Sequence, residues 1–510
     1  MGSYSVLEIV AYGAWNGGTL VDNSIYEEKG LSFKGGIPVN NKTIEERMGV
    51  RTRKVAGTDE RIGVTALQDL LDNSAIDPSR IKLVIGATNV GDDKHDKGPL
   101  IRFPYDLLRQ HCPNAHVMDL YAGCPGFNVA VELSFVLSLT GFLNSGDITV
   151  IVGAENIHRA QSFTPDDTAN IIFGDDAMAT ALATGVSKTP VGEYLGDQKI
   201  NFSAQKDHVA AIARAIYDLN GSEKFDGIII DNQLGDLIHR VPASAARVQH
   251  ALAQLMYAAE SKDGVLDRFK EALEFYDRNI RAFAFDIMTL DPKPERVETI
   301  AKAYVQSGKY NNIISVFLAP DGSGSVTRHR GTGFTFEPPQ TGIIDTLSRT
   351  HGCFAEYIQA VPVDDDIFGD MDGKGVFLYA TRGAKPHLNE LLTPNRITLD
   401  QIDLLIEHQA NFAMIPLTLE QVLDLPKEEI KAAVADLVAN KLITNVHERG
   451  NCSVVCMQRL PYDLKRGALK ADKLQGFKIN ANLEQLKKAK LILNDSVGAG
   501  MTRSSFLQRL

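Results

Sequence analysis

The sequence predicts an α/β protein built from two related halves, and two observations support this. The first is a helix-and-strand unit that recurs at an offset of 321 residues (388 − 67 = 321) without a gap. The apolar residues of the two units correspond in register: Leu67, Leu70, Leu71, Ile76, Ile81, Leu83 and Ile85 match Leu388, Leu391, Leu392, Ile397, Ile402, Leu404 and Ile406. Seven matches without a slip favour duplication over a chance likeness of two amphipathic units.

The second observation is the stretch 117–143, where a short apolar strand runs into a Gly-Cys-Pro-Gly corner and then a helix that is apolar on nearly every face. Such a helix is buried in a protein core. Asn128 and Glu132 interrupt the run, which argues against a membrane span. Cys124 is thus expected at the N-terminal tip of a buried helix, where free backbone N–H groups and the helix dipole stabilise a thiolate. A buried structural thiol is the alternative.

The composition is that of a globular protein. The 510 residues are 44% apolar and 23% charged, with room for roughly three average domains or two large ones. The net charge of −11 argues against nucleic-acid binding, and no cysteine spacing typical of zinc sites occurs. Five cysteines, an odd number, and an N-terminal stretch without a signal-peptide pattern predict a cytoplasmic protein with reduced thiols, and no membrane span is expected.

Strands and helices alternate along both halves. Strands are expected at 4–14, 81–85, 148–152 and 402–406, a helix at 59–73, and loops and turns at 17–42. Apolar segments flank a Gly-Asp turn at 171–184, and 491–510 is expected to form a strand, a Gly-Ala-Gly turn and another apolar segment.

The material between the halves has a different pattern. Helices are expected at 206–218, 242–260, 264–288 and 295–307, strands at 227–230 and 313–318, and turns at 320–341. The predicted organisation is therefore an N-terminal half at 1–195, a mainly helical insertion at 196–350 and a C-terminal half at 351–510.

Two polar residues of the second half are site candidates. His408 follows the strand at 402–406, and strand C-termini are where sites are built in α/β sheets. Asn451 lies in a Gly-bearing turn and falls roughly opposite Cys124 when the internal register is extended (451 − 124 = 327). Taken singly, a packing histidine and a turn-forming asparagine are the alternatives.

An ordered set of motifs resembles β-ketoacyl-acyl-carrier-protein synthase III and its relatives in the thiolase superfamily. The motifs are Ala122-Gly123-Cys124-x-Gly126-Phe127, Val152-Gly153-Ala154-Glu155-Asn156, Phe173-Gly174-Asp175, Met371-Asp372-Gly373-x-x-Val376-Phe377, His408-Gln409-Ala410-Asn411, Gly450-Asn451-x-Ser453 and Gly498-Ala499-Gly500-Met501-Thr502. The resemblance covers about 1–190 and 365–510. It implies the thiolase fold, in which two similar halves form a five-layer α-β-α-β-α sandwich.

The resemblance also implies a reaction. Cys124 would take an acyl group from a CoA or carrier-protein thioester, and His408 and Asn451 would bind the carbonyl of a malonyl-type extender. Decarboxylation would then give a carbanion that attacks the acyl group to form a 3-oxoacyl product. Backbone N–H groups of Cys124 and Gly500 would hold the oxyanion. No cofactor or metal is implied, and a homodimer in fatty-acid or specialised-metabolite synthesis is expected.

Two features depart from the family pattern. Members that use acetyl-CoA carry a Trp four residues before an Arg to grip the adenine; here Arg47 matches the Arg, as a substrate-binding candidate, but Thr43 stands at the Trp position. A carrier-protein or unusual donor is therefore also open. The insertion is the second departure, and it could be a lid, a lengthened acyl tunnel, a dimer or carrier-protein docking surface, or only a stabilising addition.

Other readings of the same motifs remain. Hydroxymethylglutaryl-CoA synthase needs a Glu base where this chain has Gly86-Ala87-Thr88, and nearby Asp92, Asp93 and His95 look like a solvated loop. A degradative thiolase needs a second cysteine, for which Cys452 and Cys456 are candidates by type. Acyl transfer from Cys124 to an oxygen or nitrogen nucleophile, and a non-catalytic subunit of a condensing heterodimer, are the alternatives to condensation.

Overall fold

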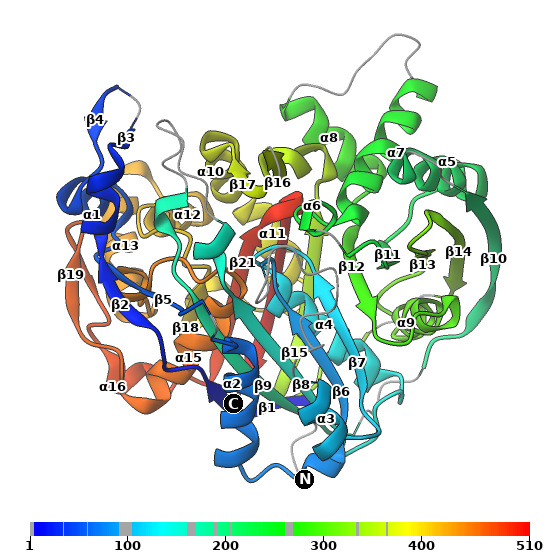
Figure 1. The fold of residues 1–510 in the computed structure, drawn as a ribbon, viewed down its shortest axis with the longest axis horizontal. Coiled ribbons are helices and arrows are strands. Elements are labelled where there is room, and N and C mark those ends of the chain that lie inside the picture. The colour runs from blue at the N-terminus through cyan, green and yellow to red at the C-terminus, as the bar shows by residue number, and fades with distance from the viewer. Residues whose placement is uncertain are drawn as a thin grey trace.

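The computed structural model describes the chain in eleven stretches: 5–33, 35–58, 60–90, 105–160, 170–186, 191–203, 207–235, 237–260, 269–332, 336–363 and 366–510. Asp92, Asp93 and His95 lie outside these residues. Within them, two main β-sheets and the helices between and around them form the body of the molecule (Figure 1).

The larger sheet has ten strands in the order β1-β9-β8-β6-β7-β12-β11-β13-β14-β10. Five come from the N-terminal half: β1 (Leu7–Ala14), β6 (Ile81–Ala87), β7 (His116–Tyr121), β8 (Ile148–Glu155) and β9 (Asp176–Thr184). Every residue of β8 is buried, as expected for a strand covered on both faces. The predicted strands at 4–14, 81–85 and 148–152 are confirmed within a few residues.

The smaller sheet has four strands in the order β15-β22-β21-β18. Their bounds are β15 (Gly342–Thr350), β18 (Leu404–Glu407), β21 (Leu491–Gly498) and β22 (Thr502–Arg509). β15 pairs with β22, so the C-terminal half begins before the predicted boundary at 351. Pairing over such a distance along the chain leaves no local signal in the sequence.

The helices complete a five-layer sandwich, as the resemblance implied. The middle layer holds α4 (Gly126–Leu139) and α15 (Cys456–Arg466), and α4 contacts strands of both sheets. Outside the larger sheet lies α2 (Ile62–Asn73), and outside the smaller one lie α11 (Ala384–Leu392), α12 (Met414–Val422) and α13 (Lys427–Asn440). The helix-and-strand repeat is confirmed, because α2 precedes β6 as α11 precedes β18.

The insertion is not mainly helical, which corrects the prediction. It adds five strands to the larger sheet: β10 (Tyr194–Ser203), β11 (Gly227–Asn232), β12 (Phe283–Thr289), β13 (Asn312–Leu318) and β14 (Ser323–Gly331). Its helices are α5 (His208–Asn220), α6 (Leu237–Arg240), α7 (Ser244–Glu260), α8 (Phe269–Asn279) and α9 (Pro294–Gln306). β12 falls where a helix was expected, because periodicity cannot separate a short buried strand from a buried helix. β14 falls where turns were expected.

Smaller elements cover the edges of the sandwich. They are β2 (Thr19–Asp22), β3 (Ser32–Phe33), β4 (Ile37–Pro38), α1 (Asn41–Met48), β5 (Thr52–Val55), α3 (Tyr105–His111), β16 (Ile358–Val363), β17 (Asp366–Met371), α10 (Gly373–Arg382), α14 (Val446–Arg449), β19 (Asp472–Leu474), β20 (Phe477–Ile479) and α16 (Leu483–Leu486). Among the helices that the structure describes, none is long and apolar enough to cross a bilayer.

Candidate active site

Cys124 lies at the predicted corner between β7 and α4. Gly123 has φ +68°, and a Cβ there would stand 2.6 Å from the backbone N of Ala499, so only glycine fits. α4 then begins at Gly126, and all of its residues are buried. The Cys124 side chain is 9% exposed. The thiol is therefore at the N-terminus of a core helix and still borders the outside.

A chain of hydrogen bonds leads away from the Cys124 sulfur. The Ser453 hydroxyl donates to Cys124 Sγ (3.3 Å) and accepts from Asn89 Nδ2 (2.7 Å). Asn89 Nδ2 also donates to Glu155 Oε1 (2.8 Å). Burial raises the pKa of Glu155 to about 7, although hydrogen bonds from Asn89 and Val90 oppose the change. Sequence reasoning did not single out Asn89 or Glu155 as site residues; the position of Asn89 just after the β6 C-terminus was the available signal.

His408 follows β18, and its backbone N–H donates to the Asp495 carbonyl (2.9 Å). Burial alone would lower the pKa of its imidazole, but the sulfurs of Cys124 and Cys456 raise that pKa to about 10. The imidazole is therefore positively charged at neutral pH. The structure thus brings His408 to Cys124, as the sequence predicted.

Cys456 is a second sulfur at this place. Burial would raise the pKa of the Cys456 thiol, but a hydrogen bond from Cys452 and the charge of His408 lower it to about 5. Its Sγ also lies 3.9 Å from Asn451 Oδ1. Sequence reasoning weighed Cys456 only as a residue of the right type; the spacing along α15 gave no sign that it reaches His408.

Asn451 is 3% exposed and is fixed from both sides. Its backbone N–H donates to the Ile172 carbonyl (2.8 Å), and its Oδ1 accepts from the Ser453 N–H (2.8 Å). Because Oδ1 is occupied, the Nδ2 group is the part of the amide that remains as a donor. Cys124, His408 and Asn451 are therefore linked through Ser453 and Cys456.

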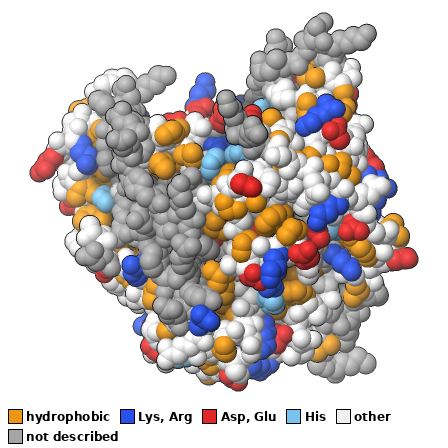
Figure 2. All heavy atoms as spheres, turned by 45° about the vertical axis from the view of Figure 1, so that its right-hand side comes forward, with side chains coloured by type: hydrophobic (Ala, Val, Ile, Leu, Met, Phe, Trp, Pro, Cys, Tyr) orange, Lys and Arg blue, Asp and Glu red, His pale blue; other side chains and the backbone are white. Residues whose placement is uncertain are grey.

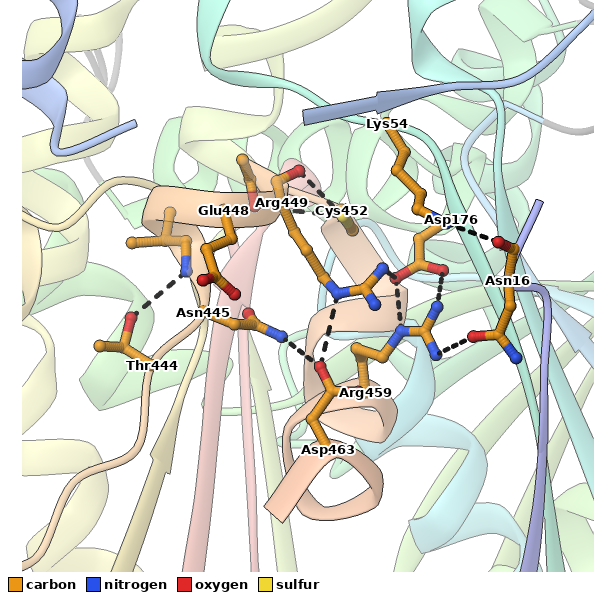
Figure 3. A network of polar contacts seen from close by, with 12 residues as sticks. Asn16, Lys54, Asp176, Thr444, Asn445, Glu448, Arg449, Cys452, Arg459 and Asp463 are labelled. Atoms are coloured by element: carbon orange, nitrogen blue, oxygen red, sulfur yellow. Dashed lines mark hydrogen bonds and ion pairs between the residues drawn. The ribbon is translucent and has the colours of Figure 1, made fainter. Parts of the chain in front are cut away.

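Buried ion pairs hold the Asn451 turn against the N-terminal half (Figure 3). The Arg459 guanidinium donates to both oxygens of Asp176 (2.8 and 2.9 Å), and the two side chains are 1% and 0% exposed. Arg449 bridges Asp176 (3.3 Å) and Asp463 (3.4 Å). The packing is also close, since a Cβ at Gly174 would lie 2.2 Å from the Arg449 carbonyl oxygen.

A small apolar pocket of about 70 Å³ opens beside Cys124. It is lined by Asn89, Val90, Cys124, Ile157, Phe173, Val241, Ile358, Gln359, Ala360, Gly369, Asp370, Met371, Ser453 and Ala499. Val241 belongs to the insertion; the other residues belong to the two halves. The pocket has room for a small apolar group next to the sulfur.

The glycine turn near the C-terminus packs directly on Cys124. A Cβ at Gly498 would stand 2.6 Å from the Cys124 backbone N, so this glycine is required for the approach. Gly500 has φ +113° and lies two residues further along the same turn. Its N–H as an oxyanion donor stays a prediction, and Gly498 is the residue against Cys124.

Arg47 lies apart from this pocket. It is exposed on α1, with its guanidinium 4.9 Å from the centre of the Phe33 ring. Thr43 is occupied as a helix cap, since its N–H donates to Asn40 Oδ1 (2.9 Å) and its hydroxyl accepts from the Asn40 N–H (3.0 Å). The role of Arg47 in substrate binding stays a prediction. No cluster of three or more His, Cys, Asp or Glu side chains suited to a metal occurs among the residues described.

Known proteins resemble the chain in sequence. No protein-family model matches it. A β-ketoacyl-[acyl-carrier-protein] synthase III of Brucella melitensis is 28% identical over 158 residues, 30% of this chain and 46% of that protein. The same enzyme of Staphylococcus saprophyticus is 28% identical over 185 residues, 34% of this chain and 52% of its own. The chain spans about half the length of the curated relatives it matches.

Solved structures resemble it in fold. The 3-oxoacyl-(acyl carrier protein) synthase III of Pseudomonas aeruginosa aligns with a TM-score of 0.53 at 15% identity, covering 99% of this chain and 98% of that one. The corresponding protein of Thermus thermophilus aligns with a TM-score of 0.52 at 17% identity, covering 99% of each chain. The fold, the ordered motifs and the sequence relatives identify the chain as a β-ketoacyl-acyl-carrier-protein synthase III-like protein of the thiolase superfamily.

Proposed function

We propose that this protein catalyses a decarboxylative Claisen condensation between an acyl group carried on Cys124 and a malonyl-type thioester. The observation that carries the proposal is the meeting of a thiol at the N-terminus of buried α4 with a charged imidazole and an asparagine amide. A nucleophile and two directed donors are what this chemistry needs.

The first half-reaction would load Cys124. Its sulfur attacks the carbonyl carbon of an acyl thioester, the carbon–sulfur bond to the CoA or carrier thiol breaks, and that thiol leaves with a proton. The dipole of α4 supports the negative charge on the attacking sulfur. The apolar pocket beside Cys124 supports seating of the acyl group away from water.

The second half-reaction would use His408 and Asn451 as hydrogen-bond donors. Held by both, the malonyl thioester carbonyl accepts the electron pair released when the bond to the carboxylate breaks and CO₂ leaves. The resulting carbanion attacks the acyl carbonyl, and the bond to Cys124 breaks, which returns the thiolate. The raised pKa of His408 supports a donor that is protonated at neutral pH. All atoms come from the two substrates, so no cofactor enters.

Substrates of this class would be acyl-CoA or acyl-carrier-protein thioesters, by analogy with the named relatives. Thr43 at the position of the adenine-gripping Trp, and the outlying Arg47, favour a donor bound in another way, such as an acyl carrier protein.

The proposal is tested by release of CO₂ from malonyl-CoA and malonyl-carrier protein, with and without a panel of acyl thioesters. We expect release that depends on the acyl donor and yields one 3-oxoacyl product per CO₂. His408→Asn should abolish it while leaving Cys124 able to accept an acyl group. Acyl transfer to water, an alcohol or an amine without malonyl consumption would show instead that the protein is a simple acyltransferase.

A further inference from the structure

The insertion repeats the topology of the N-terminal half. Numbered along the chain, the strands of the N-terminal half lie in the order first, fifth, fourth, second, third, as β1-β9-β8-β6-β7. The insertion, read from its outer edge as β10-β14-β13-β11-β12, has the same order. The directions agree at every step: antiparallel, antiparallel, parallel, parallel in both.

The helices repeat as well. α2 follows the first strand of its half and packs on β1 and β9, and α5 follows β10 and packs on β10 and β14. After the third strands come α4 and α9, which contact each other. Shifted by 167 residues, α4 would cover 293–306, and α9 is observed at Pro294–Gln306. A third copy of the half-fold accounts for all of these matches.

The two copies meet as a twofold pair does. β7 and β12, the third strand of each, run antiparallel, with Asp286 opposite Tyr121 and Met288 opposite Asp119. These pairs exchange under the same offset (286 − 119 = 167; 288 − 121 = 167), which is the rule for an isologous interface. Both aspartates are fully buried. The insertion therefore covers the edge of β7 as a second copy of the N-terminal half would (Figure 1).

The third copy has lost the nucleophile. At the same offset, Cys124-Pro125 becomes Asp291-Pro292 (291 − 124 = 167). Asp291 is exposed and paired with Lys293 (2.9 Å) and Arg296 (3.3 Å). A carboxylate neutralised in this way cannot form the acyl-thioester intermediate, so only Cys124 is left for that step.

What the third copy retains is a wall of the Cys124 pocket. Val241 precedes α7 and packs with Val90, Ile157, Ala360 and Ala499 around the pocket. Its carbonyl accepts from the Ala360 N–H (2.7 Å). The buried Asp286 of β12 accepts from the N–H groups of Ser244 and Ala245 (2.8 Å each), which fixes the start of α7. Pairing with β7 and presenting Val241 are thus one structural unit.

The sequence before the third strand agrees. Arg240-Val241-Pro242 lies between β11 and β12, and Arg102-Phe103-Pro104 stands at the matching place between β6 and β7, outside the described residues. The outer surface of the third copy carries Lys, Arg, Asp and Glu side chains among scattered hydrophobic ones (Figure 2). Among its described residues only Leu195 is a large, strongly exposed apolar side chain.

We propose that the segment from β10 to β14 is a built-in partner subunit: a third half-fold that takes the place of a second copy and completes the Cys124 pocket within one chain. The proposal replaces the homodimer that the resemblance implied. It concerns the wall of the pocket and does not depend on which acyl donor or acceptor the protein uses.

The test uses alkylation of Cys124 by iodoacetamides with N-alkyl groups of increasing length, followed by peptide mass spectrometry, so that acyl transfer is not required. Val241→Ala should speed reaction with the longer reagents about tenfold relative to iodoacetamide itself, because a pocket wall is shortened. Val241→Phe should slow them. Val305→Ala, a buried valine of the same segment on α9, is the control and should leave the length preference unchanged.

Sedimentation of the full chain completes the test. We expect a single 55.7 kDa chain, with an alkylation rate that does not change on dilution. An unchanged length preference in both Val241 variants would overturn the proposal, as would a dimer whose dissociation alters Cys124 reactivity. Since neither readout involves an acyl thioester, failure of the proposed condensation leaves this test intact.

Discussion

The charge state of His408 is the most quantitative consequence of the structure. In the folded protein its pKa is raised to about 10 and that of Cys456 is lowered to about 5, against ordinary values of 6.5 and 9.0. An imidazolium–thiolate pair is therefore expected from about pH 5 to about pH 10. The perturbation we consider is Cys456→Ala, which removes one member of this pair and leaves Cys124 in place.

The sign follows from proton counting. The raised pKa of His408 gives stability that is complete below pH 6.5 and is lost as pH rises to 10. The lowered pKa of Cys456 gives stability that is complete above pH 9.0 and is lost as pH falls to 5. Between pH 6.5 and 9.0 the two changes cancel, so the pair contributes a plateau. From pH 6.5 down to 5 it loses about 2 kcal/mol, at about 1.4 kcal/mol per pH unit.

The assay is denaturant unfolding across pH, with thiolate ultraviolet absorbance measured in parallel. Cys456→Ala should abolish the plateau, so that the remaining His408 contribution declines from pH 6.5 upward, and should remove a thiolate that titrates near pH 5. Cys452→Ala, which keeps Cys456, is the control. The reasoning is refuted if Cys456→Ala leaves the thiolate signal intact and Cys124→Ala removes it.

Three further changes test the framework of the site. Arg459→Met should lower the free energy of unfolding by about 3–5 kcal/mol in denaturant titration, because it leaves Asp176 charged and buried, and an unchanged midpoint would contradict this. Ser453→Ala should cost about 1–3 kcal/mol by removing the acceptor of a buried amide, and should change the alkylation rate of Cys124; no change in either measurement would contradict it. Gly498→Ala should prevent acylation of Cys124 in intact-mass analysis, because its Cβ would displace the Cys124 backbone; normal loading would show that the turn adapts.

The elements that carry local signals could be predicted from the sequence. The apolar run and the Gly-Cys-Pro-Gly corner placed Cys124 at the start of a buried helix, and the 321-residue repeat placed α11 and β18. The meeting of His408 with Cys124 followed from the resemblance and agrees with the structure. Each of these depends on neighbouring residues or on a repeated pattern.

The remainder depends on pairing between distant residues. The strands of the insertion join the larger sheet through β12 and β7, and the run Phe-Ala-Phe-Asp-Ile-Met-Thr at 283–289 is equally suited to a helix in sequence. Asn89 reaches Glu155 and Ser453 across 66 and 364 residues. Cys456 meets His408 because α15 crosses between the sheets. No spacing in the sequence encodes these contacts.

The central claim is that Cys124 carries the acyl group. The most direct measurement is intact-protein mass after incubation with acyl-CoA and acyl-carrier-protein thioesters, followed by peptide mapping of the adduct, with Cys124→Ala and Cys456→Ala compared. The account predicts one acyl group, located on Cys124, absent from Cys124→Ala and retained in Cys456→Ala. An adduct mapped to Cys456, or no adduct with any donor, would contradict it.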